Sequence, residues 1–344
     1  MKRARVTPTL ADVAAAADVA PITVSRVLND QPSVSNKTRD KVRKAVVELG
    51  YHPNLAARAL VTGSTQTVGV MVARANLSGP SGALLGIEQM ARARGYWVTM
   101  AGLQSDEPDE ARQAITHFIR QGVDGVIAVA QTQIAVDATL KTAGHMPTVL
   151  VSSGRIVAER SVVDIDQEDG ANQVMTLLRG LGHTRIAHIT GPAGDLHAEA
   201  REAVWRASLP PNQDADGLRL RGDWSAASGY RAAMSMLAMD EPPTAVFAGN
   251  DRTAFGVIRA INERGFRIPS HMSVVGFDDI DGADYTSPPL TTIRQDHIAL
   301  GMTAMELLLE AIADRPIRRV KIPPQLIVRA STGVARRGPL PATD

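Results

Sequence analysis

Four side chains that could bind a small polyhydroxylated ligand follow strand-like runs of this 344-residue sequence. They are Arg201, Trp224, Asn250 and Asp278. Carboxylates and amides bond to neighbouring hydroxyls, arginine adds a planar fork of donors, and an aromatic face covers the apolar side of a sugar ring. In parallel sheets ligands bind where the carboxyl ends of the strands meet. These residue types therefore favour a sugar site.

Structural roles for the same residues remain open from sequence alone. Asn250 or Asp251 could cap a helix over 251–264, Asp279 could cap a turn, and Trp224 could belong to a core. No enzyme pattern is present, because the chain lacks a Walker A sequence, G-x-S-x-G, H-E-x-x-H and a G-x-G-x-x-G after a strand. We therefore expect no catalytic residue, no metal site and no cofactor.

The first fifty residues predict three helices. Thr9 and Ser35 are suited to cap the first and third, and Pro21 suits the first position of the second. The predicted ranges are 10–17, 21–29 and 36–49. Two short helices joined by a tight turn, with a third closing the core, form a helix-turn-helix unit, whose second helix enters the DNA major groove. A small helical bundle without a nucleic-acid role would give the same pattern.

Charge is unevenly distributed along the chain. Residues 1–60 hold ten Lys/Arg and five Asp/Glu, a net of +5, whereas the rest holds 27 against 31, a net of −4. A basic segment on a mildly acidic body indicates contact with a polyanion, although a solvated basic surface fits equally well. The absence of cysteine excludes disulfides and thiolate zinc sites. No signal peptide and no apolar run of about 20 residues is present, so we expect a cytoplasmic protein.

From residue 67 onward, apolar runs alternate with amphipathic helical segments. The predicted strands are 67–73, 96–100, 125–129, 148–151, 185–190, 218–221, 245–248 and 273–277. The predicted helices include 82–94, 108–121, 169–181, 197–207, 225–238, 251–264 and 297–314. This alternation favours two doubly wound parallel sheets, each covered on both faces. We expect the chain to cross between the halves near 161–164 and near 290, and expect residues 322–329 to add late strands to the second half.

Several motifs, in order, resemble the lactose-repressor family of transcription regulators. They are Thr9-Leu-Ala-Asp-Val-Ala14, Val24-Ser-Arg-Val-Leu-Asn29, Val34-Ser-Asn-Lys-Thr-Arg39, Leu49-Gly-Tyr-His-Pro-Asn54, Gly222-Asp-Trp-Ser-Ala-Ala-Ser-Gly229, Gly276-Phe-Asp-Asp279 and Pro288-Pro-Leu-Thr-Thr-Ile-Arg-Gln-Asp296. The resemblance extends to about residue 332. It implies a helix-turn-helix headpiece, a hinge helix and an effector-binding and dimerisation domain of the periplasmic-binding-protein type.

The domain limits that this resemblance implies are as follows. The headpiece spans 1–52, the hinge helix and linker 53–64, the effector-binding domain 65–335 and a tail 336–344. Within the effector-binding domain the N-subdomain covers about 65–163 plus 293–320, and the C-subdomain about 164–290 plus 321–335.

The resemblance also implies which headpiece residues bind DNA. Arg26 can bond bidentately to guanine O6 and N7, so we expect it to read sequence. Pro21 and Ile22 can offer only apolar contact to base edges, whereas both positions are polar in the family's namesake. The operator sequence of that protein therefore cannot be assumed for this chain. The remaining predicted contacts are Thr9, Thr23, Ser25, Asn29, Ser35, Lys37, Thr38 and Tyr51. Ser25, Asn29, Ser35, Lys37 and Thr38 resemble phosphate contacts, with capping or solvation as the alternative for each.

Residues 54–60 form a short Ala-rich segment whose helix would be marginal alone in water. By resemblance it is a hinge helix, with Asn54 and Ala57 at the DNA, which orders when two copies pack in the minor groove. Leu60 matches the residue that wedges between base pairs and kinks the duplex. The alternative for Leu60 is packing against its own domain.

For the effector site the resemblance adds Gln295 and His297 to the four residues above, and a helix start near the cleft adds Pro80 and Ser81. Three positions depart from the family's namesake, which has aspartate at Ser152, asparagine at Val129 and phenylalanine at His297. We therefore expect a carbohydrate effector, but lactose-type specificity does not carry over.

The expected function is a repressor that binds a pseudo-palindromic operator and is released by a carbohydrate. After Thr332 the chain holds Gly and Pro without a heptad repeat, so we expect a homodimer, with 82–94 and 251–262 as dimer faces by resemblance. The expected location is the cytoplasm, at the nucleoid. The alternatives are a co-repressor-dependent regulator of the purine-repressor type and a free-standing sugar carrier.

Overall fold

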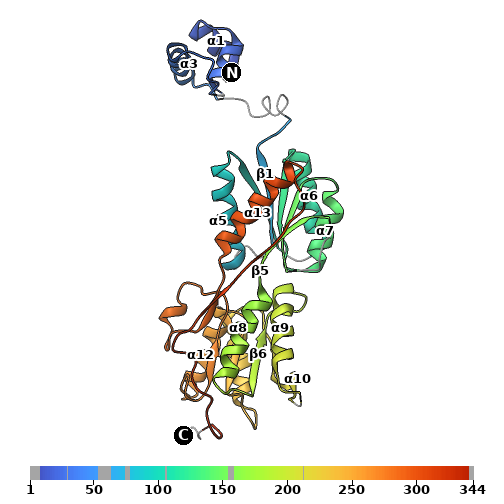
Figure 1. Ribbon diagram of the computed structural model, residues 1–344, viewed down its shortest axis with the longest axis vertical. Helices are drawn as coiled ribbons and strands as arrows, with labels where there is room; N and C mark the ends of the chain where they lie inside the picture. Colours follow the sequence, from blue (N-terminus) through green and yellow to red (C-terminus); the bar gives the residue numbers. More distant parts are fainter. Residues whose placement is uncertain are drawn as a thin grey trace, which may run out of the picture. The chain divides into compact units, whose positions relative to one another are not determined.

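The computed structural model describes residues 8–28, 30–52, 63–73, 78–104, 107–153, 159–211 and 213–340 (Figure 1). The chain divides into two compact units, residues 1–65 and residues 66–344. The predicted hinge residues Asn54, Ala57 and Leu60, and also Asn29, lie outside the described residues.

The first unit consists of α1 (Leu10–Ala17), α2 (Pro21–Leu28) and α3 (Asn36–Leu49). These bounds confirm the three predicted helices. The shared core consists of Val13, Ala14, Ala17, Val24, Val27, Val42, Ala45 and Tyr51. Leu49 at the end of α3 is 37% exposed, whereas Ala45 one turn earlier is buried in the core.

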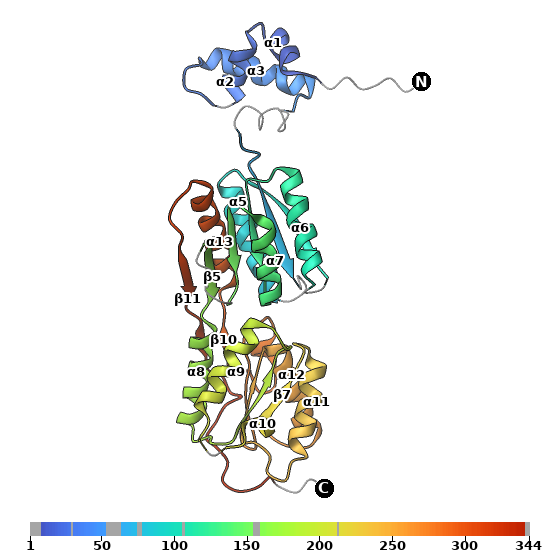
Figure 2. The same cartoon turned by 90° about the vertical axis from the view of Figure 1, so that its right-hand side faces the viewer.

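The second unit contains two lobes, and we call the first the N-lobe. Its parallel sheet has the strand order β11-β5-β4-β3-β1-β2. The strands are β1 (Thr67–Ala73), β2 (Trp97–Leu103), β3 (Gly125–Val129), β4 (Thr148–Val151), β5 (Ser161–Ile165) and β11 (Arg319–Ile322). Helices α5 (Ser78–Ala93) and α13 (His297–Ile312) cover one face, and α6 (Pro108–Gln121) and α7 (Gln133–Ala143) cover the other (Figures 1 and 2). Every residue of β3 and β4 is buried, as expected for a parallel sheet covered on both sides.

Glycines let α5 and α13 pack closely together. A Cβ atom at Gly301 would lie 1.9 Å from the carbonyl oxygen of Ala83, and one at Gly86 would lie 2.1 Å from that of Ile298. This contact ties the late helix α13 to the N-lobe.

The C-lobe is built around a four-stranded parallel sheet of order β7-β6-β8-β9. Its strands are β6 (Ile186–Thr190), β7 (Arg219–Arg221), β8 (Ala245–Ala248) and β9 (Ser273–Val275). Helices α8 (Gln167–Gly180) and α9 (Leu196–Ser208) pack together on one face, and α11 (Ala226–Leu237) and α12 (Asp251–Glu263) on the other (Figure 2). The remaining elements are α10 (Ala215–Leu218), the 3₁₀ turn η1 (Ala283–Tyr285) and an antiparallel pair, β10 (Thr292–Arg294) with β12 (Gln325–Ile327).

The two doubly wound parallel sheets are confirmed, and three details of the prediction are wrong. Helix α5 begins at Ser78 instead of Gly82, since Pro80 is tolerated in a first turn, where backbone N–H groups have no partner within the helix. Strand β2 runs on to Leu103 because it pairs with β1 along its full length. Residues 322–329 do not all join the second half, because β11 pairs with β5 of the N-lobe and only β12 lies in the C-lobe.

Candidate functional site

In the first unit, α2 exposes one face while the other closes the core. Val24 and Val27 are buried, whereas Ile22 is 58% exposed and Arg26 is also exposed. Within the described residues the Arg26 side chain has no hydrogen bond or ion pair. This face therefore presents one cation, Arg26, and two apolar side chains, Pro21 and Ile22, to the surroundings of the unit.

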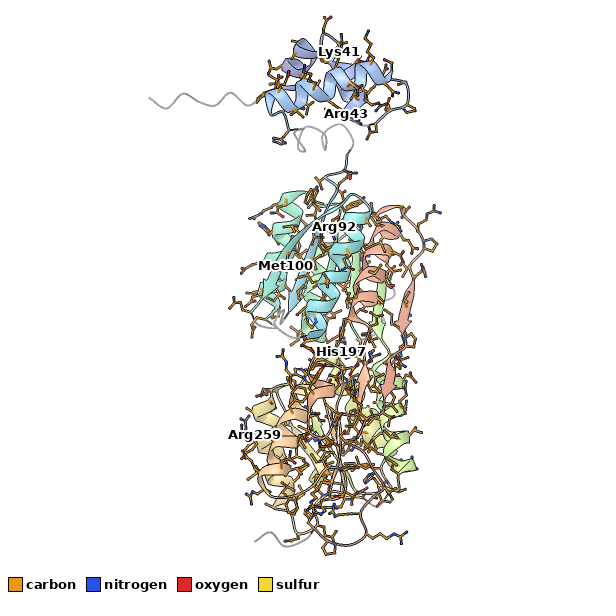
Figure 3. All side chains as sticks on the ribbon, turned by 90° about the vertical axis from the view of Figure 1, so that its left-hand side faces the viewer. Lys41, Arg43, Arg92, Met100, His197 and Arg259 are labelled. Atoms are coloured by element: carbon orange, nitrogen blue, oxygen red, sulfur yellow. The ribbon has the colours of Figure 1, made fainter. Side chains whose placement is uncertain are left out.

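Several other polar residues of the first unit also have local roles. The Thr9 hydroxyl accepts a hydrogen bond from the Asp12 backbone N–H at 3.3 Å, and Asp12 Oδ2 accepts from the Thr9 N–H at 2.7 Å. The Ser35 hydroxyl accepts from the Thr38 N–H at 3.3 Å. Arg43, visible in Figure 3, lies 3.3 Å from the carboxylate of Asp30. Thr9 and Ser35 are thus helix caps, as the sequence pattern suggested.

In the second unit a cavity lies between the two lobes, at the level of His197 in Figure 3. It contains about 730 Å³ of space, including the part open to solvent. The lining residues are Gly79, Pro80, Ala83, Val129, Gln131, Val151, Asp164, Ile165, Gln167, Asp195, His197, Arg201, Trp224, Asn250, Arg252, Asp278, Gln295, His297 and Leu300. The N-lobe thus supplies aliphatic side chains together with Gln131, Asp164 and His297, and most of the C-lobe lining is polar.

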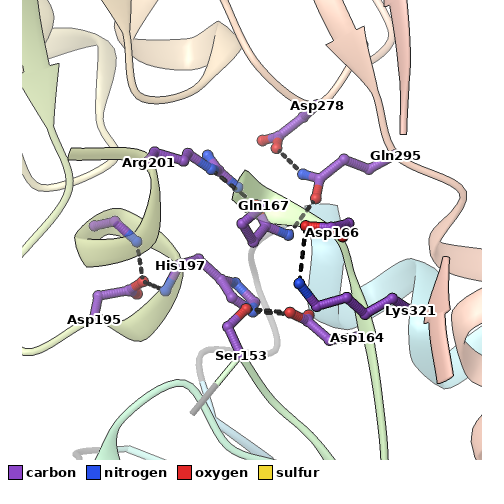
Figure 4. Close-up of polar contacts among 11 residues, drawn as sticks. Ser153, Asp164, Asp166, Gln167, Asp195, His197, Arg201, Asp278, Gln295 and Lys321 are labelled. Carbon is purple, nitrogen blue, oxygen red and sulfur yellow. Dashed lines mark hydrogen bonds and ion pairs between the residues drawn. The ribbon is translucent and has the colours of Figure 1, made fainter. Parts of the chain in front are cut away.

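One chain of hydrogen bonds joins four of these polar residues (Figure 4). Arg201 Nε donates to Gln167 Oε1 at 2.9 Å, and Gln167 Nε2 donates to Gln295 Oε1 at 2.9 Å. Gln295 Nε2 then donates to Asp278 Oδ1 at 2.6 Å. Arg201 also donates to the Gly249 carbonyl oxygen, and its guanidinium carbon lies 3.7 Å from the ring centroid of Phe277. This chain fixes the orientation of all four side chains at the cavity wall.

Trp224 is held in place by backbone and side-chain contacts. It has a positive φ of 68°, and its indole N–H donates to Asp195 Oδ2 at 3.3 Å. A Cβ atom at Gly191 would lie 2.1 Å from the Trp224 ring, so only glycine leaves room for this orientation. Asn250 Nδ2 donates to the Trp224 carbonyl at 3.2 Å, and Asn250 Oδ1 caps α12 by accepting from Thr253 N–H at 2.9 Å.

A second group of polar side chains lies where the N-lobe meets α9 (Figure 4). Asp164 on β5 has its Oδ1 atom 3.4 Å from His197 Nε2, and its Oδ2 accepts a hydrogen bond from Ser153. His297 begins α13 and packs against the start of α5, where a Cβ atom at Gly82 would lie 2.7 Å from the His297 Cβ. The histidines and the carboxylate thus come from three different elements.

Comparison with known proteins identifies the family. Residues 9–54 match the family model for bacterial regulatory proteins of the lacI family, and residues 175–332 match the periplasmic binding protein-like domain. The lactose operon repressor of Escherichia coli (strain K12) is 34% identical over 331 residues, which cover 95% of this chain and 91% of that protein. The chain belongs to the lacI family of bacterial regulatory proteins.

Other relatives and solved structures agree with this assignment. The HTH-type transcriptional repressor PurR of Vibrio cholerae serotype O1 is 32% identical over 330 residues, 93% of this chain and 97% of that protein. A Lac repressor dimer bound to operator and the anti-inducer ONPF matches with a TM-score of 0.86 and 32% identity, covering 95% of this chain and 99% of that one. A complex of the regulator CelR with cellobiose matches with a TM-score of 0.69 and 32% identity, over 94% and 99% of the two chains. The chain is therefore a DNA-binding transcriptional repressor of the lacI family, and not an enzyme.

Most of the effector residues predicted for this lacI-family repressor line the cavity described above. They are Pro80, Arg201, Trp224, Asn250, Asp278, Gln295 and His297. Ser81 is exposed and Ser152 is buried at the end of β4, and neither lines this cavity. In the headpiece, Tyr51 is only 8% exposed and packs in the core, which leaves little of its ring for contact with DNA.

Burial shifts the pKa of several groups in and beside the cavity. It raises the pKa of Asp278 to about 6, against the opposing charge of Arg201, and that of Asp251 to about 7, where the Asp278 charge adds to the effect. Burial lowers the pKa of His297 to about 4. For His197 burial acts in the same direction, but the neighbouring carboxylate of Asp164 outweighs it and raises the pKa of the imidazole.

Sequence reasoning missed six polar residues of the cavity. They are Gln131, Asp164, Gln167, Asp195, His197 and Arg252. Asp195 and His197 stand at the start of α9, directly after β6, so the strand-end rule that selected Arg201 could have found them. The described residues hold no cluster of three or more His, Asp or Glu side chains placed to bind a metal ion, and none of their helices is long and apolar enough to cross a bilayer.

Proposed function

We propose that this lacI-family repressor is released from its operator by a small carbohydrate that binds in the cavity between the lobes. The observation that carries the proposal is the fixed set of Arg201, Gln295, Asp278 and Trp224 at one wall of that cavity. The set offers hydroxyl-binding groups next to an aromatic face, which is the chemistry that sugar rings require. The CelR–cellobiose complex, whose chain is 32% identical, also supports a sugar ligand.

We propose that the DNA contacts come from the exposed face of α2 and from the start of α3. Arg26 reads a guanine, Ile22 and Pro21 contact apolar base edges, and Thr23 and Ser25 flank them on the same helix. Lys37 and Thr38 contact phosphates at the start of α3, where the helix dipole favours anions. Two copies of the chain bind a pseudo-palindromic operator, one headpiece on each half-site.

Release requires the sugar to bind the conformation with low operator affinity more tightly than the other, because equal affinity for both would shift nothing. Lobe closure around the cavity supplies such a difference, since Arg201 belongs to the C-lobe and Pro80 to the N-lobe. We propose that this closure in one dimer changes the fit of the two headpieces to DNA.

A purine-type response is the second candidate, because PurR relatives match nearly as much of the chain as the lactose operon repressor does, 93% against 95%, at similar identity. In that case ligand-free protein would bind the operator weakly, and a purine base would strengthen binding. The direction of the ligand effect separates the two candidates.

The test combines a thermal-shift screen with operator binding. Purified protein is screened against neutral mono- and disaccharides and against hypoxanthine and guanine, because a ligand that binds only the folded state raises Tm. Each hit is then added to a complex of the protein with a fluorescent operator selected from genomic fragments. We expect a sugar to raise Tm and to lower the anisotropy of the labelled DNA.

The matched variants are Asp278→Ala, which should lose both effects of the sugar, and Asp137→Asn, which removes an exposed carboxylate on α7 and should retain both. A purine that strengthens operator binding while no sugar raises Tm would replace the proposal with the co-repressor mechanism.

A further inference from the structure

The cavity is lined by two groups of polar side chains, one in which the side chains hydrogen-bond to one another and one in which several polar atoms have no partner. In the chain from Arg201 to Asp278, each side chain bonds to the next. The second group, which we call the Asp164 group, consists of Gln131, Asp164, His197 and His297. Its members also line the cavity, but Gln131 Oε1, Asp164 Oδ1, His197 Nε2 and both ring nitrogens of His297 are buried without a hydrogen-bond partner.

Unpaired polar atoms in a buried position are unusual and destabilising, so a concentration of them needs a reason. Gln131 is 8% exposed and Asp164 is 7% exposed. Five of the unpartnered atoms among the described residues belong to these four side chains. Their common position at the cavity wall indicates that the missing partner is a ligand.

The backbone brings the Asp164 group together from both lobes. Gln131 follows β3, and its carbonyl oxygen accepts a hydrogen bond from Leu196 N–H at 2.9 Å, directly before His197. The Asp164 Oδ1 and His197 Nε2 atoms lie 3.4 Å apart without the geometry of a hydrogen bond. An acceptor of the N-lobe and an imidazole of the C-lobe thus face the same space.

The atom types define the ligand that fits. Gln131 Oε1 and an ionised Asp164 can only accept, so the ligand must donate to them, and an imidazole N–H can donate in return. A hydroxyl meets both needs at once, because it can donate to Asp164 and accept from His197.

Charge argues against an anionic ligand. The carboxylates of Asp164, Asp195 and Asp278 line the cavity, whereas the Arg201 guanidinium is already bonded to Gln167 and to a backbone carbonyl. Arg252, the other arginine in the lining, is exposed. A phosphate or carboxylate group would therefore meet more like charge than opposite charge at this wall.

We propose that the Asp164 group is a specificity-determining subsite for two neighbouring hydroxyl groups of an uncharged sugar, with Asp164 and Gln131 accepting and the two histidines donating. The proposal rests on the proposed function, because it places the same sugar in the same cavity. It goes further because it proposes that Asp164 and Gln131 of the N-lobe make the protein prefer neutral sugars to charged ones.

The probes are glucose, galactose, ribose, cellobiose and lactose, with glucose 6-phosphate and glucuronate as charged counterparts. For each neutral sugar that raises Tm, titration calorimetry gives Kd for the parent protein and for Asp164→Asn, Gln131→Leu and the control Asp137→Asn. We expect Asp164→Asn to weaken binding at least about tenfold, the loss typical of a hydrogen bond to a charged group. Gln131→Leu should weaken it severalfold, and Asp137→Asn should leave it unchanged.

Deoxy analogues of the bound sugar test direct contact. Removal of the hydroxyl that Asp164 binds should weaken the parent protein's affinity about tenfold, but should weaken that of Asp164→Asn less than threefold, because the partner is already gone. If Asp164 had only a structural role, removing the hydroxyl would weaken the affinity of Asp164→Asn by the same factor as that of the parent protein.

Two results separate this proposal from the proposed function. If a sugar binds and Asp278→Ala abolishes its binding while Asp164→Asn and Gln131→Leu bind as the parent does, only the subsite is overturned. The subsite alone is also overturned if glucose 6-phosphate or glucuronate binds more tightly than its neutral counterpart. If none of the sugars binds the parent protein, the proposed function and the subsite are overturned together.

Discussion

The headpiece and the cavity of this repressor place their polar side chains in opposite environments. On α2, Arg26 is exposed and has no partner among the described residues, whereas Arg201 in the cavity wall is only 3% exposed and bonds to two other residues. An exposed polar group loses nothing by being unpaired, because water hydrogen-bonds to it, but a buried one such as the Arg201 guanidinium destabilises the fold when its partners are removed. Headpiece substitutions should therefore change DNA affinity and leave stability intact, whereas cavity substitutions should change stability as well.

The largest expected effect comes from Arg201→Ala. The change removes two hydrogen bonds and the stacking on Phe277, and leaves Gln167 and Asp278 without a buried cation. Breaking a buried charged network by truncating one partner typically costs about 3–5 kcal/mol. Urea denaturation at neutral pH, followed by tryptophan fluorescence, measures the loss.

The control for this prediction is Arg231→Ala in the same lobe, because the Arg231 side chain is 68% exposed and its ion pair with Asp223 is 3.8 Å long. A surface pair of this kind contributes about 0–1 kcal/mol. Equal losses for the two variants would contradict the contrast between buried and exposed arginines.

The second prediction concerns Asp251, which is fully buried beside the cavity and accepts hydrogen bonds from Thr292 Oγ1 at 2.6 Å and Ile280 N–H at 2.9 Å. Burial raises its pKa from 3.8 to about 7, so its contribution to stability is complete below pH 3.8 and is lost as the pH rises through 7. Asp251→Asn removes this titration. The difference in unfolding free energy between variant and parent should therefore shift in favour of the variant by about 2–3 kcal/mol between pH 5 and pH 8.

Other buried groups also titrate in or near this pH range. Burial lowers the pKa of His188 and of His297 to about 4, so acidification below their ordinary pKa destabilises the fold. Both histidines are present in parent and variant, and their contributions cancel in the difference. Asp278, whose pKa is raised to about 6, is coupled to Asp251 by charge, so the measured shift includes the loss of that coupling. A pH-independent difference would show that Asp251 is ionised in the folded protein.

The same contrast explains what could be predicted from sequence. The caps at Thr9 and Ser35 act within one turn of helix, so local pattern was enough to place α1 and α3. The positions of Arg201 and Asp278 after predicted strands likewise identified them as candidate ligand-binding residues. The pairing of Asp164 with His197 depends on how two lobes meet, which no local spacing encodes.

The late crossing between lobes shows the same limit. Strands β11 and β12 join different sheets, although only Pro323 and Pro324 separate them. Proline cannot donate to a strand ladder, so this pair was a usable signal for the end of β11. The choice of sheet for each strand, in contrast, is decided by long-range pairing with β5 and β10.

The third prediction, of smaller size, is that Arg26→Ala relaxes operator choice. Loss of a bidentate contact to guanine removes about 1–3 kcal/mol of discrimination at one base pair of each half-site. Because Arg26 is exposed, unfolding free energy should change by less than about 0.5 kcal/mol. Operator selection from a randomised duplex pool measures the first quantity, and an unchanged sequence preference would remove Arg26 from base recognition.

The smallest expected effect is that of Lys37→Ala at the start of α3, where the side chain is exposed. A phosphate contact adds equally to every DNA sequence, so the variant should weaken specific and random duplex alike. The plot of log K against log salt should lose about 0.9 from its slope for each contact removed, and twice that for a dimer. Lys44→Ala is the control, because Lys44 already pairs with Glu48 at 3.8 Å and lies two turns further along the helix. An identical slope for parent and Lys37→Ala would mean that Lys37 faces solvent in the complex, and the charge excess of the first sixty residues would then act through other lysines and arginines.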